Sequence, residues 1–294
     1  MAMKDFFIFL VLCGLPLRMQ AQIAISRTDK SDGHGAWEQK YAMSNPYASH
    51  TVNLYCTANT EKTPASFNIG VPEPYTAAVG RHAGLFKMTV NGINMKTINI
   101  DNDAIATFKD DKTGCAGVCF PGNFDGAKVE VKIFLKTNSP LLFISISPAL
   151  EMISPINSVQ VEVMACVNLS TDAKIRWDRA TYERESITPV RSITSTDRAG
   201  VALKPNENSV IFQDKKFSSG SKNYSGVGYI VFDNTDVTEA VLRNGPYQIV
   251  NFTLKPDFKT FTFAAWRSKN ILGNEEFQIF YKENPWMFSM EGKK

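Results

Sequence analysis

The feature that most constrains the fold of this chain is an alternation of polar and apolar residues with a period of two. The alternation is clearest over residues 128–135 and 158–163, where valine, isoleucine or leucine occupies every second position. Successive side chains of a β-strand point to opposite faces of its sheet, so each segment predicts a strand with one buried face and one solvated face. Such strands bury their apolar faces against a second layer, which predicts an all-β protein.

Turn signals divide the rest of the chain into further strands. Asn91-Gly92 separates residues 84–90 from 93–98 and predicts a tight hairpin, because both residues readily adopt the positive φ of a type I′ turn. Residues 141–147 are nearly all apolar and predict a central strand that is buried on both faces. Additional strands are expected over residues 208–213, 226–232, 247–254 and 259–266.

Helix is expected at two places. Residues 236–239 have the form of a capping box, which predicts one or two helical turns before Gly245-Pro246. Residues 274–283 are the stronger candidate, with a capping Asn274, two glutamates in the first turn and an apolar stripe along one face. A strand over residues 277–281 is the alternative.

Together these segments predict a large antiparallel two-sheet sandwich with one or two short helices. We expect it to form one domain over residues 22–294. Residues 147–155 contain two Ser-Pro pairs and could link two domains. Strands flank them closely on both sides, however, which favours a crossover between the two sheets.

The first 21 residues have the layout of a secretory signal peptide. Lys4 precedes the apolar run 6–12, and Ala21 offers a small residue for cleavage. We therefore expect a periplasmic or secreted protein that begins near Gln22. A lipid anchor at Cys13 is disfavoured, because Leu12 stands where a small residue is preferred. No later apolar run is long enough for a membrane-spanning helix, so an integral membrane protein is not expected.

Charge and cysteine content exclude some classes of function. The formal net charge is +3, and Lys and Arg are scattered, so no nucleic-acid partner is expected. Cys115 and Cys119 lie in a glycine-rich segment that could close a small disulfide ring, whereas Cys56 and Cys166 have the apolar surroundings of buried thiols. No histidine stands at ligand spacing from the Cys115/Cys119 pair, so we expect neither a metal site nor a cofactor.

Two histidines are the candidate catalytic residues. His34 and His82 are each flanked by glycine, which exposes a side chain, and an imidazole titrates near neutral pH. Packing of these histidines within surface loops is the alternative. His50 opens a predicted strand and is expected to be structural.

The candidate binding residues combine aromatic rings with charged neighbours. The apolar face of a sugar ring stacks on an aromatic side chain, while its hydroxyls pair with carboxylates and guanidinium groups. A solvated hairpin, with its charges paired across strands and its tryptophan in the core, is the alternative. The candidates are Trp37, Glu38, Arg81, Trp177, Asp178, Arg179, Tyr182, Glu183 and Arg184.

Residues 245–266 place two long predicted strands on either side of a Lys255-Pro256 turn. This segment, about a tenth of the chain, resembles the late strands of exported bacterial β-proteins with a galactose-mutarotase-like supersandwich. That two-sheet fold occurs in sugar epimerases and in glycosidase and lyase domains. The resemblance implies a histidine pair and a glutamate around the sugar, which here would be His34 and His82 with Glu275 or Glu276. The segment contains no catalytic motif of that family.

These observations support three hypotheses. The first is an exported protein that binds or processes carbohydrate, with a glycan or polysaccharide as partner. The second is a non-catalytic adhesion or assembly module of the cell envelope. The third is an enzyme of the mutarotase, glycosidase or lyase type that uses His34 and His82. Serine-hydrolase, nucleotide-binding and zinc-protease motifs are absent from the sequence.

Overall fold

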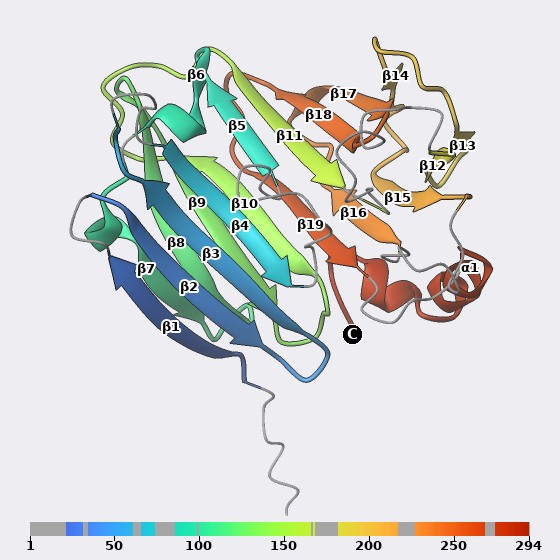
Figure 1. Cartoon of the computed structure of the whole chain (residues 1–294), viewed down its shortest axis with the longest axis horizontal. Helices are drawn as coiled ribbons and strands as arrows, with labels where there is room; N and C mark the ends of the chain where they lie inside the picture. The colour runs from blue at the N-terminus through green and yellow to red at the C-terminus, as the bar shows by residue number, and fades with distance from the viewer. Residues whose placement is uncertain are drawn as a thin grey trace, which may run out of the picture.

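The computed structural model describes residues 22–31, 35–60, 66–73, 86–98, 100–165, 167, 182–216, 227–267 and 274–293. Within these residues the strands form three antiparallel sheets (Figure 1). The four-stranded sheet has the order β1 (Ala24–Ser31), β2 (Trp37–Ser44), β3 (Ser49–Thr57), β4 (Ser66–Glu73). The six-stranded sheet has the order β14 (Val201–Ala202), β17 (Val237–Asn244), β18 (Gln248–Leu254), β11 (Val159–Ala165), β5 (Phe86–Val90), β6 (Ile93–Asn94). The nine-stranded sheet has the order β13 (Ser192–Ile193), β12 (Arg184–Ile187), β15 (Ser209–Asp214), β16 (Gly228–Phe232), β19 (Phe261–Arg267), β10 (Leu142–Pro148), β9 (Ala127–Lys136), β8 (Cys115–Phe124), β7 (Ala106–Asp110).

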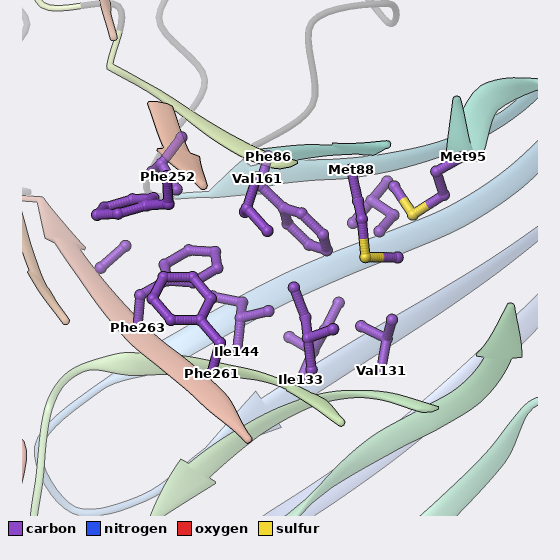
Figure 2. Packing of buried hydrophobic residues seen from close by; sticks show 14 of the residues in the cluster. Phe86, Met88, Met95, Val131, Ile133, Ile144, Val161, Phe252, Phe261 and Phe263 are labelled. Carbon is purple, nitrogen blue, oxygen red and sulfur yellow. The ribbon is translucent and has the colours of Figure 1, made fainter. Parts of the chain in front are cut away.

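The three sheets make two layers. The four-stranded and six-stranded sheets lie beside each other, and the nine-stranded sheet lies behind both (Figure 1). At the junction, β4 contacts the 3-10 turn Met95–Thr97 that follows β6. One apolar core fills the space between the layers, and Figure 2 shows Phe86, Met88 and Val161 facing Ile133 and Ile144 across it. The predicted all-β sandwich is therefore confirmed, with one of its layers divided into two sheets.

Periodicity located the central strands correctly. The apolar side chains of β9 and β11 are buried at every second position, as their alternation predicts. Strand β10 pairs with β9 on one side and β19 on the other, and Phe143 and Ile144, which point to opposite faces, are both buried. The hairpin at Asn91-Gly92 is also confirmed, with φ of 50° and 81° at its two turn residues.

The two strands predicted on either side of the Lys255-Pro256 turn are present, but they do not pair with each other. Strand β18 pairs with β11 and β17, whereas β19 pairs with β10 and β16, so the two strands belong to different layers. The turn between them carries Phe258 into the core, where its side chain is buried. An alternating pattern is the same for a hairpin and for an arch between sheets, so the sequence could not separate them. The segment 147–155 is a crossover between the layers, as expected, because it joins β10 to β11.

The helix expected after residue 236 is absent, and β17 begins there instead. Val237 and Thr238 are β-branched residues that suit a strand, and β17 pairs with β18 from Val237 to Asn244, with one irregularity between Val237 and Glu239. Asp236 does not cap a helix, since its Oδ2 accepts a hydrogen bond from the backbone N–H of Lys259 at 2.8 Å. The side chain thus fixes the arch between β18 and β19.

The second predicted helix is confirmed as α1 (Asn274–Glu283). It covers the outer face of the nine-stranded sheet beside β19 and β16 (Figure 1). Phe277 is fully buried against Trp266, at a ring-centroid distance of 5.8 Å, and against Phe288 of the 3-10 turn Pro285–Phe288. A second apolar cluster therefore lies on the outer side of this sheet.

Glu207 is a buried carboxylate that anchors the loop before β15. It accepts hydrogen bonds from the Arg191 guanidinium at 2.8 and 3.0 Å, from Thr188 Oγ1 at 2.7 Å and from the backbone N–H of Lys204 at 2.7 Å. Burial acts to raise the pKa of Glu207, but these hydrogen bonds outweigh it and lower the pKa from 4.5 to about 2.

This lowered pKa predicts a loss of stability in acid. The carboxylate stabilises the folded state above about pH 4.5, and the contribution disappears as the pH falls towards 2. Because Arg191 is one-third exposed, we expect a contribution of roughly 2 kcal/mol rather than the full value of the shift. Urea unfolding at several pH values should show Glu207→Gln less stable than wild type near neutral pH and converging with it in acid. Glu239→Gln, a control at an exposed position, should have the stability of the wild type at every pH. If the stability of Glu207→Gln differs from that of the wild type by the same amount at every pH, the lowered pKa of Glu207 is contradicted.

Candidate functional site

Three segments that are distant in the sequence meet at one end of the sandwich. They are the β2–β3 turn, the β9–β10 connection and the residues after α1. Asn45 fixes the first segment to the second, because its Nδ2 donates to Lys136 O and Ser139 O, both at 2.6 Å. The Oδ1 of the same side chain accepts from the backbone N–H groups of Tyr47 and Ala48, both at 2.8 Å. One asparagine thus sets both the position and the shape of the turn.

The residues after α1 are fixed to the same connection. The backbone N–H of Lys293 donates to Asn138 O at 2.9 Å, and Asn138 Nδ2 donates to Lys293 O at 2.6 Å. Lys136 Nζ donates to Met290 O at 2.6 Å. Gly292 has φ of 80°, and a Cβ there would lie 2.6 Å from Asn138 Oδ1, so this close approach requires glycine.

Beside these anchors lie the exposed ring of Tyr47 and the half-buried ring of Trp286. The rings of Tyr47 and Trp286 are 5.1 Å apart at an interplanar angle of 65°, and Tyr47 is 41% exposed. The Lys293 ammonium lies 5.3 Å from the centre of the Trp286 ring. Tyr47, Trp286 and Lys293 are called the aromatic platform below. Its ring faces can stack on apolar surface, while the phenol and the ammonium can hydrogen-bond to hydroxyls or to an anionic group.

Trp37 and Glu38, expected to bind together, point to opposite faces of β2. Trp37 packs against the core, with its ring centroid 6.1 Å from that of Phe67. Glu38 accepts a hydrogen bond from Asn53 Nδ2 at 2.8 Å. The structure therefore does not bring the two side chains into one site.

Arg184 and Tyr182 are buried. The Arg184 guanidinium lies 4.2 Å from the centre of the Tyr182 ring and 3.1 Å from Asp214 Oδ2. It also donates to the backbone oxygens of Gly245, at 3.2 Å, and Pro246, at 2.7 Å, and to that of Val167. Of the described part of the predicted cluster, only Glu183 is exposed. Arg184 therefore joins β12 to the β17–β18 turn within the protein.

The other sequence candidates have varied outcomes. His50 is buried and its Nε2 lies 2.9 Å from Pro140 O, which confirms its structural role. Glu275 and Glu276 are exposed at the start of α1. The remaining candidates lie outside the described residues. These are the signal peptide 1–21 with Cys13, and His34, Arg81, His82, Cys166, Trp177, Asp178 and Arg179.

The expected disulfide is absent. Cys115 and Cys119 have free thiols and stand on one strand, β8, four positions apart. Residues at that spacing on an extended strand are about 13 Å apart, well beyond the roughly 7 Å that a disulfide allows between Cα atoms. The glycine between them, Gly117, serves the strand and not a loop. Cys56 is buried with a free thiol, and burial raises the pKa of that thiol, as expected for a packing residue.

No known protein family profile matches the chain. No curated protein sequence matches it either. Among solved structures, it is similar to the alpha-N-acetylgalactosaminidase of Bifidobacterium bifidum, at 10% identity and a TM-score of 0.43, over 90% of this chain and 40% of that one. It is also similar to the alpha-galactosidase of Lactobacillus brevis, at 10% identity and a TM-score of 0.38, over 87% of this chain and 43% of that one. The chain spans about two fifths of the length of these proteins, and membership of the galactose-mutarotase-like group stays a prediction.

Two other features are absent from the described residues. No three His, Cys, Asp or Glu side chains among them gather closely enough to hold a metal ion. None of the helices in this part of the chain is long and apolar enough to cross a membrane.

The aromatic platform was missed at the sequence level, although a signal for it exists. Tyr47 and Trp286 each follow an Asn-Pro pair, in Asn45-Pro46-Tyr47 and Asn284-Pro285-Trp286. Asn-Pro favours turns, so an aromatic residue directly after it is placed near the surface. The repeated pattern of Asn-Pro followed by an aromatic residue was a local signal for rings near the surface. It gave no indication that the two rings would contact each other.

Proposed function

We propose that the protein is an exported carbohydrate-binding protein and that the aromatic platform is a glycan-contacting site. The observation that carries the proposal is the pairing of the Tyr47 and Trp286 rings, with Tyr47 on a turn held by Asn45 and Lys293 beside Trp286 on a segment held by Asn138. Tyr47 is exposed and Trp286 is half-buried, and aromatic rings that the fold already holds in place lose little conformational freedom when a ligand stacks on them. Lys293 adds a hydrogen-bond donor beside the rings.

The angle between the rings indicates the kind of glycan. At 65° the two rings cannot both lie flat against a straight, ribbon-like polysaccharide. One ring can stack on a sugar face while the other contacts its edge, which suits a bent oligosaccharide or a chain terminus. Trp177, Asp178, Arg179 and Arg81 remain predicted contacts, and His34 with His82 remain the predicted pair of the enzymatic alternative.

The test is titration of the purified protein with a panel of soluble oligosaccharides and polysaccharides, followed by tryptophan fluorescence and calorimetry. We expect saturable binding to at least one glycan, weakened about tenfold or more by Trp286→Ala and by Tyr47→Ala, which corresponds to about 1.4 kcal/mol. Val190→Ala, at an exposed apolar position away from the platform, should bind as the wild type does.

The same titration separates the alternatives. Binding that survives both platform variants but is lost in Trp177→Ala would move the site to the cluster predicted from sequence. A folded protein that binds no member of the panel would contradict carbohydrate recognition.

A further inference from the structure

The crossover loop between β10 and β11 exposes a compact group of aliphatic side chains. Leu150 is fully exposed, Ile153 is 85% exposed and Met152 is 42% exposed. A single exposed aliphatic residue is ordinary on a protein surface, but here three lie within four positions of one loop, interrupted only by Glu151. Leu150, Met152 and Ile153 are called the apolar tip below.

The backbone that carries this tip is firmly held. Ala149 N donates to Lys128 O at 3.0 Å, and the N–H groups of Ile153 and Ser154 both donate to Gly126 O, at 3.0 and 3.1 Å. Farther along the loop, Asn91 Nδ2 donates to Pro155 O at 2.9 Å. Both ends of the loop are therefore fixed to neighbouring turns, and the tip projects from a rigid base.

The shape and size of the tip restrict what can cover it. Three side chains supply a few hundred Å² at most, whereas a stable protein–protein interface buries at least about 1,200 Å² in total. A second copy of the chain would also bring Glu151, which lies within the tip, close to its own equivalent. A bilayer needs no complementary shape, and each aliphatic side chain that enters it contributes independently through its apolar area.

The charges beside the tip indicate the kind of lipid surface. Glu151 and Asp125 are exposed, and none of the ion pairs among the described residues includes them; Lys128 follows three positions after Asp125 in the supporting turn. With two carboxylates and one ammonium, the surface beside the tip carries a net negative charge, which an anionic membrane would repel. Zwitterionic headgroups carry an ammonium that can pair with these carboxylates. We infer that the apolar tip inserts Leu150, Met152 and Ile153 into the headgroup–acyl boundary of a zwitterionic lipid bilayer.

Vesicle flotation tests this inference. Wild-type protein should associate weakly and reversibly with phosphatidylcholine vesicles, and less with phosphatidylglycerol vesicles. The double variant Leu150→Ser/Ile153→Ser should lower the partition coefficient at least tenfold, since each buried aliphatic side chain is worth about that factor. Ile279→Ser/Val190→Ser, which removes two other exposed aliphatic residues, should float as the wild type does.

A second readout guards against indirect effects. Tryptophan emission of Leu150→Trp should shift to shorter wavelength with phosphatidylcholine vesicles and be quenched by brominated lipid, whereas Val190→Trp should not respond. Three results would overturn the inference. They are unchanged emission of Leu150→Trp with vesicles, flotation of the Leu150→Ser/Ile153→Ser variant like that of the wild type, and binding to anionic vesicles alone. Dimerisation, measured by light scattering, that this double variant abolishes would also overturn it.

Discussion

Replacing Arg184 with methionine is expected to lower the free energy of unfolding by about 3 to 5 kcal/mol. The guanidinium is buried and lies 3.1 Å from Asp214 Oδ2, whose side chain is also fully buried. Methionine fills similar volume but leaves the Asp214 carboxylate without its cation and the carbonyls of Gly245 and Pro246 without this donor. An uncompensated charge in the interior is among the most destabilising changes a single substitution can make.

Urea unfolding measures this effect, and two variants make the result interpretable. Glu183→Ala changes the exposed neighbour and should stay within about 0.5 kcal/mol of wild type. Arg184→Met/Asp214→Asn removes both charges and should recover part of the loss. If Arg184→Met cannot be purified in a folded form, recovery of folded protein in the double variant carries the same information. A loss below about 1 kcal/mol in Arg184→Met would show that the pair contributes little to the fold.

Gly117→Ala is expected to cost about 3 kcal/mol, although it adds a single methyl group. A Cβ at Gly117 would collide with the backbone oxygen of Ile133 and lie 2.5 Å from Phe134 Cβ and 2.6 Å from Phe134 Cα. Most of these are backbone atoms of the adjacent strand, so no change of side-chain rotamer relieves the collision. Phe108 and Phe134 are the residues opposite Gly117 on the two neighbouring strands, and their ring centroids are 6.1 Å apart. The two rings shield the backbone at Gly117, which has no side chain of its own to do so.

Gly228→Ala is the matched control, because Gly228 also lies buried within a strand of the same sheet. Its nearest neighbours would be 3.5 to 3.7 Å from a new Cβ, which is ordinary contact distance. We expect Gly228→Ala to be neutral or to stabilise the protein by up to about 1 kcal/mol, since alanine restricts the unfolded chain. Equal thermal midpoints for the two variants would show that the β8–β9 pair adjusts to a methyl group.

The sequence predicted those strands, turns and helices that are determined by a few neighbouring residues. The alternation in β9 and β11, the turn at Asn91-Gly92 and the glutamates in the first turn of α1 each act over a few residues, and the structure confirms these strands, this turn and this helix. The choice of strand partner depends on the whole chain. For that reason the sequence did not reveal that β18 and β19 separate into two layers.

The candidate site shows the same division. The charged appearance of residues 182–184 suggested exposure, but Arg184 is buried because Asp214, thirty positions later, neutralises it. Cys115 and Cys119 suggested a ring because glycines surround them, yet one of those glycines accommodates a close strand pair. Tyr47 and Trp286 come from opposite ends of the chain and meet only in the folded protein.

The position of β19 has a consequence for the order in which the protein can fold. Every other described strand precedes β19 in the chain, yet β19 lies at the centre of the nine-stranded sheet, between β16 and β10. Without it that sheet would be two four-stranded blocks, each with an open edge. During synthesis the native sheet therefore cannot close until residues 261–267 have emerged. Formation of this sheet is tied to synthesis of residues 261–267, and a product terminated before them would lose the strand that unites the layer.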